Sequence, residues 1–327
     1  MKFQSPSEFN LIPENEYSSA MPKVESLLAE AKIGGSFASF DGTMINYEYF
    51  LRENAKASVV VVHGYTEFIE KFYEVAYYFL CEGYNVFLYD QRGHGRSERA
   101  VMPYTLTHVE KFSDYVDDLS EYIEKIVVPA SEGKKLYLFG HSMGGTVSAF
   151  YLMRGGERIE KAVLSSPMIC PYSAHFPRKL LKFIIKEQYS KKLGWKAKFP
   201  HTGGDFDENP DFSKSSDTSY PRFLRNLEIR KSDKRYQNTS STNRWMYEAL
   251  SVREKLLVKS EASKVKASVL LVSAENDTVV KNKDEFKFAS LLPKCETYVA
   301  LGSKHTVFTG EYPIQKAYYE KVFAFLK

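Results

Sequence analysis

Residues 135–145 read KLYLFGHSMGG and contain the pattern Gly-x-Ser-x-Gly at positions 140–144. The apolar run 136–139 has the length of a buried strand, and residues 146–153 (TVSAFYLM) are apolar with small side chains, as in a buried helix. Glycines on both sides of a serine permit a sharp strand-to-helix turn from which the hydroxyl projects, because they carry no Cβ. The stretch therefore predicts a nucleophile elbow with Ser142 at its tip.

Strand and helix patterns alternate on both sides of this turn. Residues 34–51 alternate around Asp41-Gly42, which predicts a hairpin of two antiparallel edge strands. Further strands are expected as buried apolar runs, at 58–62, 85–89, 162–166, 268–273 and 296–301. Helical patterns separate them, at about 69–81, at 107–126 behind a capping box of Thr107 and Glu110, at 286–292 and at 313–326. The order predicts a doubly wound α/β fold, with helices on both faces of a mostly parallel eight-stranded sheet.

The alternation stops after Pro167. Residues 168–240 show no clear buried strand and contain five prolines and a polar run near 203–219. We expect a first core part at 1–167, of which residues 1–33 form an N-terminal extension with a peripheral helix. A cap insertion is expected at 168–240, and the core resumes at 241–327.

Composition narrows the function classes. Of 327 residues, 43% are hydrophobic and 26% are charged, which is ordinary for a globular protein with a sizeable core. The net charge of +4 is too small to indicate nucleic-acid binding, and no protein partner is expected. Cys81, Cys170 and Cys295 lack metal-site spacing, so neither a disulfide framework nor a zinc site is expected. Since no apolar leader or membrane span is visible, we expect a cytoplasmic protein.

A serine hydroxyl is a weak nucleophile and requires a base within hydrogen-bond reach and a third group that orients the base. His305 follows the last expected strand, and Asp277 follows the strand before it. Both positions lie at the carboxyl edge of the sheet, where Ser142 is also expected and where open α/β sheets form ligand sites. The order Ser142, Asp277, His305 is that of nucleophile, acid and histidine in α/β-hydrolases. Glu275 is an alternative acid, and either carboxylate could serve only as a helix cap.

Charge that develops on a substrate carbonyl oxygen requires two preorganised N–H donors. The amide of Met143, directly after the serine, is the first candidate. The second is the amide of Tyr65, because Gly64 permits close backbone approach in the loop after the third strand. In the same loop, Glu67 and Lys71 are interpreted as a helix-start charge and its i,i+4 partner.

The remaining histidines are interpreted as structural. His63 and His141 lie in tight turns beside the site, where a buried histidine usually holds backbone groups. Structural or surface positions are expected for His94, His108, His175 and His201. The polar run 90–97 (DQRGHGRS) is interpreted as a turn that braces the elbow, since its strand-end Asp and Arg are flanked by glycines.

Several ordered motifs together carry a specific resemblance. They are residues 63–67 (HGYTE), 90–97 (DQRGHGRS), 140–145 (GHSMGG), 275–277 (END) and His305. From residue 58 to 327 the chain resembles α/β-hydrolases of the serine aminopeptidase-like branch, which contains bacterial lysophospholipases and monoacylglycerol lipases. Residues 232–236 (SDKRY) and 243–250 (NRWMYEAL) are similar to the lysophospholipase side. One departure is Ala274, since a glycine often precedes such acids in the family.

The resemblance implies a serine hydrolase that cleaves carboxylic esters of single-chain lipids, lysophospholipid or monoacylglycerol, without a metal or organic cofactor. Ser142 would attack, His305 would take and return the proton, and Asp277 would orient the histidine. The amides of Tyr65 and Met143 would hold the oxyanion. Alternatives are a general carboxylesterase or thioesterase, a proline-type aminopeptidase, and a non-catalytic binding module on the same fold.

Residues 178–195 (RKLLKFIIKEQYSKKLGW) interleave apolar and basic side chains, with Glu187 as their only acid. The pattern predicts a cap helix that packs its apolar side on the core and keeps its lysines in water. The alternative is an interfacial helix that contacts an anionic membrane surface and lets a single-chain amphiphile reach Ser142.

Overall fold

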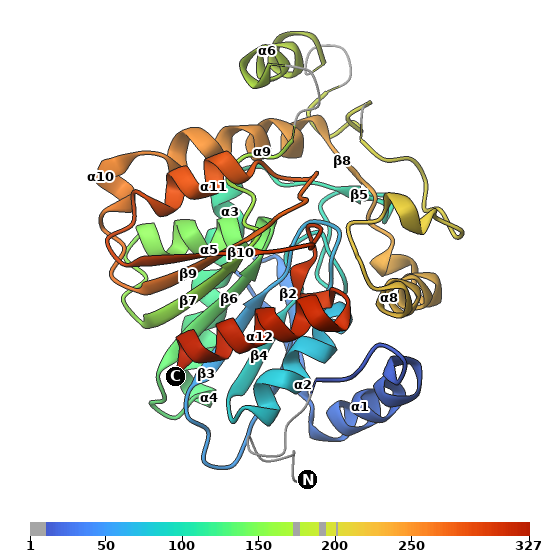
Figure 1. The fold of residues 1–327 in the computed structure, drawn as a ribbon. Helices are drawn as coiled ribbons and strands as arrows, with labels where there is room; N and C mark the ends of the chain where they lie inside the picture. The colour runs from blue at the N-terminus through green and yellow to red at the C-terminus, as the bar shows by residue number, and fades with distance from the viewer. Residues whose placement is uncertain (1–10, 173–176, 190–193, 201) are drawn as a thin grey trace.

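The computed structural model describes residues 11–172, 177–189, 194–200 and 202–327. Its centre is an eight-stranded sheet with the order β1-β2-β4-β3-β6-β7-β9-β10 (Figure 1). The strands are β1 (Ile33–Ala38), β2 (Met44–Phe50), β3 (Ser58–Val62), β4 (Asn85–Tyr89), β6 (Leu136–His141), β7 (Ile159–Ser165), β9 (Ser268–Ala274) and β10 (Cys295–Ala300). β1 pairs antiparallel with β2, and β2 with β4, whereas the other pairs in this sheet are parallel. The predicted mostly parallel eight-stranded sheet is confirmed.

The middle strands are apolar on both faces because helices cover both sides of the sheet. Every residue of β3, β4 and β6 is buried, as continuous apolar runs in a parallel sheet require. The hairpin forms around Asp41-Gly42 as predicted, with Gly42 at φ +86°. Of the two hairpin strands, however, β1 alone lies at an edge of the sheet, because β2 continues the sheet by pairing with β4.

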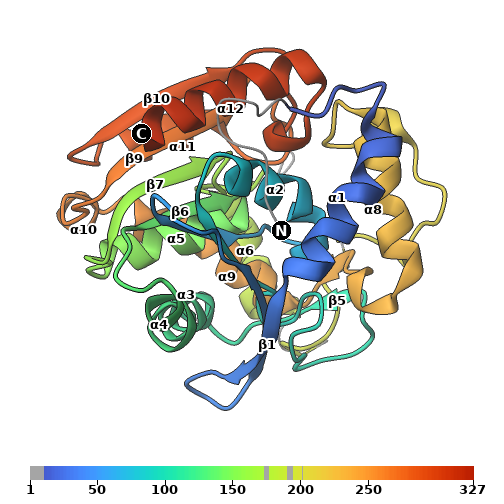
Figure 2. The same ribbon diagram turned by 90° about the horizontal axis from the view of Figure 1, so that it is seen from below.

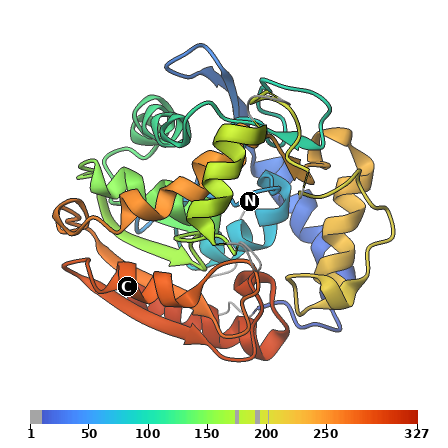
Figure 3. The same cartoon turned by 90° about the horizontal axis from the view of Figure 1, so that it is seen from above.

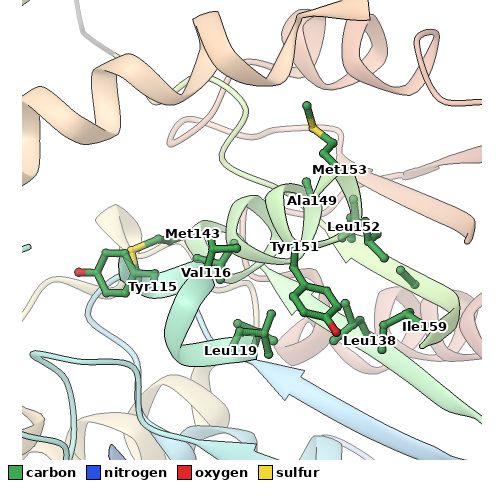
Figure 4. Packing of buried hydrophobic residues seen from close by; sticks show 14 of the residues in the cluster. Tyr115, Val116, Leu119, Leu138, Met143, Ala149, Tyr151, Leu152, Met153 and Ile159 are labelled. Carbon is green, nitrogen blue, oxygen red and sulfur yellow. The ribbon is translucent and has the colours of Figure 1, made fainter. Parts of the chain in front are cut away.

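Helices of the two faces belong to two separate apolar clusters. On one face lie α1 (Tyr17–Ala31), the 3-10 turn η1 (Ile69–Phe72), α2 (Tyr73–Cys81), the 3-10 turn η6 (Val307–Thr309) and α12 (Tyr312–Leu326), seen from below in Figure 2. On the other lie α3 (Phe112–Tyr122), its π-helical continuation η2 (Ile123–Val127), α4 (Val128–Ala130), α5 (Met143–Met153), α9 (Asn243–Leu256) and α11 (Asn282–Ala289). Figure 4 shows Ala149 and Leu152 of α5 in one packed layer with Val116 and Leu119 of α3. None of the described helices is long and apolar enough to cross a membrane.

Between β7 and β9 the chain leaves the large sheet. The elements there are α6 (Arg178–Ile184), the π turn η3 (Ile185–Tyr189), η4 (Phe212–Lys214), α8 (Tyr220–Ser232), η5 (Lys234–Tyr236), β8 (Ser240–Ser241), α9 and α10 (Lys259–Ala262). Seen from above in Figure 3, α6 lies over α9, and α8 lies at the side next to α1. The described residues of 168–240 add no strand to the large sheet. The boundaries of core and cap stay a prediction.

Thr107 does not cap a helix. It belongs to β5 (Leu106–Thr107), which pairs in parallel with β8 in a separate two-stranded sheet. α3 begins only at Phe112, where the carboxylate of Asp114 accepts a hydrogen bond from the Lys111 amide at 3.0 Å. The predicted capping box of Thr107 and Glu110 is therefore wrong, because this stretch first forms the strand that attaches the cap to the core.

One buried arginine joins the N-terminal extension, the core and the cap. The side chain of Arg222 on α8 is 1% exposed and pairs with Glu74 of α2 at 2.7 Å. It also pairs with Glu14 ahead of α1 at 2.8 Å and donates to Gln315 of α12 at 3.0 Å. Since a buried charge without partners is strongly destabilising, the two carboxylates and the amide are what make this burial tolerable. The extension is thus fixed to the cap as well as to the core.

Candidate active site

Ser142, Asp277 and His305 meet at the carboxyl edge of the sheet. Ser142 follows β6, Asp277 follows β9, and His305 lies in the loop after β10. His305 Nε2 is 2.9 Å from Ser142 Oγ, and His305 Nδ1 is 2.7 Å from Asp277 Oδ2. Ser142 and His305 are 6% and 5% exposed. In this arrangement the imidazole can accept the hydroxyl proton at Nε2 while the carboxylate holds Nδ1.

The backbone at Ser142 has the conformation of a strained elbow. Its φ of 52° and ψ of −118° lie outside the regions that non-glycine residues favour. Three backbone hydrogen bonds hold it, from the Ser142 amide to Ser165 O at 3.0 Å and to Ser142 O from the amides of Met168 at 2.9 Å and Thr146 at 3.2 Å. A Cβ on Gly144 would lie 2.0 Å from Val62 O. Glycine is therefore required where α5 begins against the end of β3.

The two candidate acids point in different directions. Glu275 is exposed, and its Oε2 accepts a hydrogen bond from the Gly302 amide at 2.8 Å. Asp277 Oδ1 accepts from two backbone amides of its own loop at 2.8 and 3.0 Å, which leaves Oδ2 for His305. The structure therefore places Asp277, and not Glu275, beside the histidine.

The surroundings favour a neutral base beside an ionised acid. Burial lowers the pKa of His305, and Asp277 opposes this shift only in part. Burial would raise the pKa of Asp277, but the hydrogen bond and charge of His305 outweigh it, so that this pKa lies below its ordinary value. At neutral pH the imidazole can therefore accept a proton, and the carboxylate can stabilise the imidazolium that forms.

The N–H groups of the two predicted oxyanion donors make no hydrogen bond to the residues that the structure describes. The amides of Tyr65 and Met143 have no acceptor there, whereas the Ser142 amide is bonded to β7. Met143 is the first residue of α5, so its N–H is one of the free donors of a helix N-terminus. Its side chain is fully buried. The Tyr65 ring stacks on Trp245 of α9 with centroids 4.2 Å apart, which supports the loop from the cap side.

Glu67 makes contacts that the sequence pattern did not reveal. The predicted i,i+4 pair with Lys71 forms at 2.8 Å. The second carboxylate oxygen accepts a hydrogen bond from the Gly64 amide and lies 2.9 Å from His141 Nδ1. Burial would raise the pKa of Glu67, but His141 and Lys71 outweigh it and hold that pKa well below its ordinary value. This buried carboxylate thus ties the loop after β3 to the elbow.

Of the two histidines in the tight turns beside the site, His63 holds backbone groups as predicted, whereas His141 mainly contacts the Glu67 carboxylate. His63 Nε2 accepts a hydrogen bond from the Gln91 amide at 2.9 Å, and burial lowers the pKa of His63 to about 4. His94 and His108 are also buried. Burial likewise lowers the pKa of both imidazoles. The remaining two, His175 and His201, lie outside the described residues.

The turn at 90–97 braces the loop after β3 rather than the elbow. Asp90 Oδ1 accepts from the Ile69 amide at 3.0 Å, and Gln91 bonds both the ring and the carbonyl of His63. Arg92 pairs with an aspartate of α3 at 2.6 Å. These contacts agree with the structural interpretation of the turn, although the segment that it supports is a different one.

The basic segment at 178–195 divides its apolar side chains between core and solvent. Ile185 is fully buried against α9, whereas Leu180 and Phe183 are 49% and 62% exposed. Lys182 does not extend freely into water, because it forms an ion pair with Glu254 at 2.6 Å. Residues 190–193 lie outside the described part. The segment thus packs partly as the cap helix that was predicted and partly presents apolar side chains to water.

Known proteins are similar to this chain in sequence and in fold. The family described as serine aminopeptidase, S33, matches residues 53–311. The chain is 29% identical to the probable lysophospholipase L2 of Haemophilus influenzae over 76% of this chain and 77% of that protein. It is 28% identical to lysophospholipase L2 of Escherichia coli over 88% and 81%, respectively. Its fold is similar to a soluble variant of monoglyceride lipase from Saccharomyces cerevisiae, with a TM-score of 0.70 and 20% identity over 90% and 94% of the two chains. Since the family match spans most of its length, the chain belongs to the serine aminopeptidase S33 family of α/β-hydrolases.

Proposed function

We propose that this protein is a serine hydrolase that cleaves carboxylic esters of single-chain lipids, with lysophospholipids or monoacylglycerols as substrates. The observation that carries the proposal is the hydrogen-bonded line from Ser142 Oγ through His305 to Asp277. Relatives named lysophospholipase L2, similar over most of both chains, support the substrate class. The cytoplasmic location stays a prediction.

The mechanism follows from the positions of the five residues. Ser142 Oγ attacks the ester carbonyl carbon while His305 Nε2 takes the hydroxyl proton. The amides of Tyr65 and Met143 donate to the oxyanion of the tetrahedral intermediate. His305 then protonates the leaving alcohol, and an acyl-enzyme remains. His305 deprotonates a water molecule that attacks the acyl carbon. The bond between that carbon and Ser142 Oγ then breaks, His305 returns the proton to Ser142 Oγ, and the fatty acid is released. Asp277 stabilises the imidazolium in both halves.

Alternative activities use the same catalytic groups. A thioesterase or an aminopeptidase differs in the leaving group and not in the triad, so substrates must separate them. A non-catalytic binding module would not require a histidine with a lowered pKa between a serine and an ionised acid.

We further propose that α6 contacts an anionic lipid surface. Leu180 is about half exposed and Phe183 is more exposed than that. Lys179 and Lys186 on the same short segment are also exposed. Apolar side chains flanked by lysines are what interfacial helices present to lipid. Lys182 contributes less, because it is held by its pair with Glu254.

Ser142→Ala should lower kcat for p-nitrophenyl butyrate about 10⁴-fold or more, because only binding and oxyanion stabilisation remain. Fluorophosphonate labelling should be lost while the thermal unfolding transition is kept. Wild-type turnover by folded Ser142→Ala protein would mean that another residue is the nucleophile. A wild type that is neither labelled nor active would favour the binding module.

Asp277→Asn should lower kcat about 10³- to 10⁴-fold, because an amide at this position misplaces the histidine tautomer. Glu275→Gln, the matched control, should stay near wild type, since Glu275 only holds an exposed turn. Measured from pH 5 to 9, wild-type kcat/KM should be lost only below the ordinary histidine pKa of about 6.5, because the pKa of His305 is lowered. The reverse ranking of the two variants would assign the acid to Glu275.

Acyl-chain length should control kcat/KM on p-nitrophenyl esters. Each methylene buried in an acyl site contributes roughly 0.8 kcal/mol, so kcat/KM should rise several-fold per carbon until the site is full. Lysophosphatidylcholine and monoacylglycerol should release fatty acid, and an aminoacyl amide should not react. A flat series together with amide cleavage would instead support the aminopeptidase, and a preference for acyl thioesters would support the thioesterase.

Salt should weaken activity on anionic mixed micelles and leave p-nitrophenyl acetate hydrolysis unchanged. The reason is that exposed charges are screened over about 8 Å at physiological ionic strength. Lys179→Glu should flatten the micelle slope, and Phe183→Ser should weaken micelle activity at all salt concentrations. Lys134→Glu, an equal charge change just ahead of β6 at the amino edge of the sheet, is the control. Identical slopes for all proteins would leave α6 as an ordinary cap helix.

A further inference from the structure

Cap residues hold the chain directly after His305. The Thr306 amide donates to Ser216 O at 3.2 Å. The Thr306 hydroxyl proton is shared between Ser216 O at 2.6 Å and Asp217 Oδ1 at 2.7 Å. The same carboxylate oxygen accepts from Thr309 Oγ1 at 2.9 Å. Asp217 therefore holds both ends of the short turn that follows the histidine.

The chain directly before His305 is held by the same cap segment. Lys304 Nζ donates to Ser215 O at 3.0 Å and to Ser213 O at 3.3 Å. Asp217 is itself fixed within the cap, because its Oδ2 accepts from Ser215 Oγ at 3.0 Å and its amide donates to that hydroxyl at 3.0 Å. Cap residues 213–217 thus bracket His305 on both sides in the chain.

The carboxylate in this contact is buried and compensated. Asp217 is 6% exposed, and Thr306 and Thr309 are 3% and 6% exposed. Lys71 lines the same small pocket as Asp217, and the charges of Glu67 and then Asp217 raise the pKa of Lys71 against the effect of burial. Hydroxyl donors and a nearby cation are what a buried carboxylate requires. Lys71 also pairs with Glu67, which holds the loop that carries Tyr65.

We propose that Asp217 is a positioning residue, which sets the place of His305 relative to Ser142 through Thr306 and Thr309 and so couples the cap to the catalytic base. The inference rests on the proposed function. The core holds the loop of His305 at Ser303, whose carbonyl accepts from the Asn276 amide at 2.9 Å, and at Phe308, whose carbonyl accepts from Gln315 at 3.0 Å. Between these two points, the side chains of Lys304 and Thr306 are bound by the cap. A displacement of about 1 Å can cost about 10²-fold in rate, so this support bears on catalysis.

The pH profile distinguishes positioning from a purely structural contact. The charged and titratable groups that face His305 are Asp277 in the loop after β9, His141 at the end of β6 and Glu67 in the loop after β3. Burial is the largest cause of the lowered His305 pKa. If the loop is released and admits water, this pKa rises toward about 6.5. The acid limb of kcat/KM then moves to higher pH.

The first test compares Asp217→Ala with Asp211→Asn on p-nitrophenyl butyrate. Asp217→Ala should lower kcat 10- to 100-fold, change KM less than about 2-fold and shift the acid limb upward. Fluorophosphonate labelling of Ser142 should slow in proportion to kcat. Asp211 lies in the same cap segment, is exposed and accepts hydrogen bonds from Ser213 at 2.8 and 2.9 Å. Asp211→Asn should therefore match wild type in all three readouts.

A second pair of variants decides the question where Asp217→Ala does not fold. Thr306→Val removes the hydroxyl donor and should lower kcat and shift the acid limb, whereas Thr306→Ser keeps the donor and should restore both. Folded variants with wild-type kcat and acid limb would overturn the inference while the proposed function stands. A wild type without esterase activity or labelling would overturn both.

Discussion

The geometry of the site depends on the close approach of α5 to the end of β3. A Cβ on Gly144 would lie 2.0 Å from Val62 O, so only glycine lets the helix begin there. This contact places the amide of Met143 and the loop with Tyr65 next to Ser142. Its cost is an unfavourable backbone conformation at Ser142, of the order of 1–3 kcal/mol. The hydrogen bonds of Ser142 with Ser165 and Met168 hold that conformation in place.

Two buried carboxylates then connect the loops around the elbow. Glu67 joins the loop after β3 to His141, and Asp217 joins the cap to the loop of His305, while Lys71 carries the positive charge near both. Exposed ion pairs contribute about 0–1 kcal/mol, whereas leaving one partner of a buried pair alone costs about 3–5 kcal/mol. These buried contacts therefore constrain the relative positions of donor, nucleophile and base far more than the surface pairs do.

The sequence predicted the parts of the structure that local pattern determines. The eight strands, the hairpin and the elbow depend on apolar runs and glycines that neighbours in the chain define, and Asp277 and His305 follow strand ends. Contacts between distant segments were missed or misassigned. From its local sequence Thr107 resembles a helix N-cap. Its strand is defined only by pairing with β8, which lies more than a hundred residues later in the chain. From its local sequence Glu67 resembles a helix-start partner of Lys71, because nothing near it in the chain indicates that it is buried in contact with His141.

The two parts of the cap make different kinds of contact with the rest of the described chain. The half with α8 is fixed by the buried pair of Arg222 with Glu74, by the pair of Arg222 with the partly exposed Glu14, and by the contacts of residues 213–217 with the His305 loop. Moving it would expose several buried charges and displace the base. The half with α6 rests on α9 through the buried side chain of Ile185 and through partly exposed ion pairs to Glu254. Among the described residues, these pairs are more exposed than the pair of Arg222 with Glu74, and exposed pairs contribute less to stability. A displacement of residues 213–217 would therefore remove the hydrogen bonds that hold the His305 loop from the cap side, whereas a displacement of α6 would leave them intact.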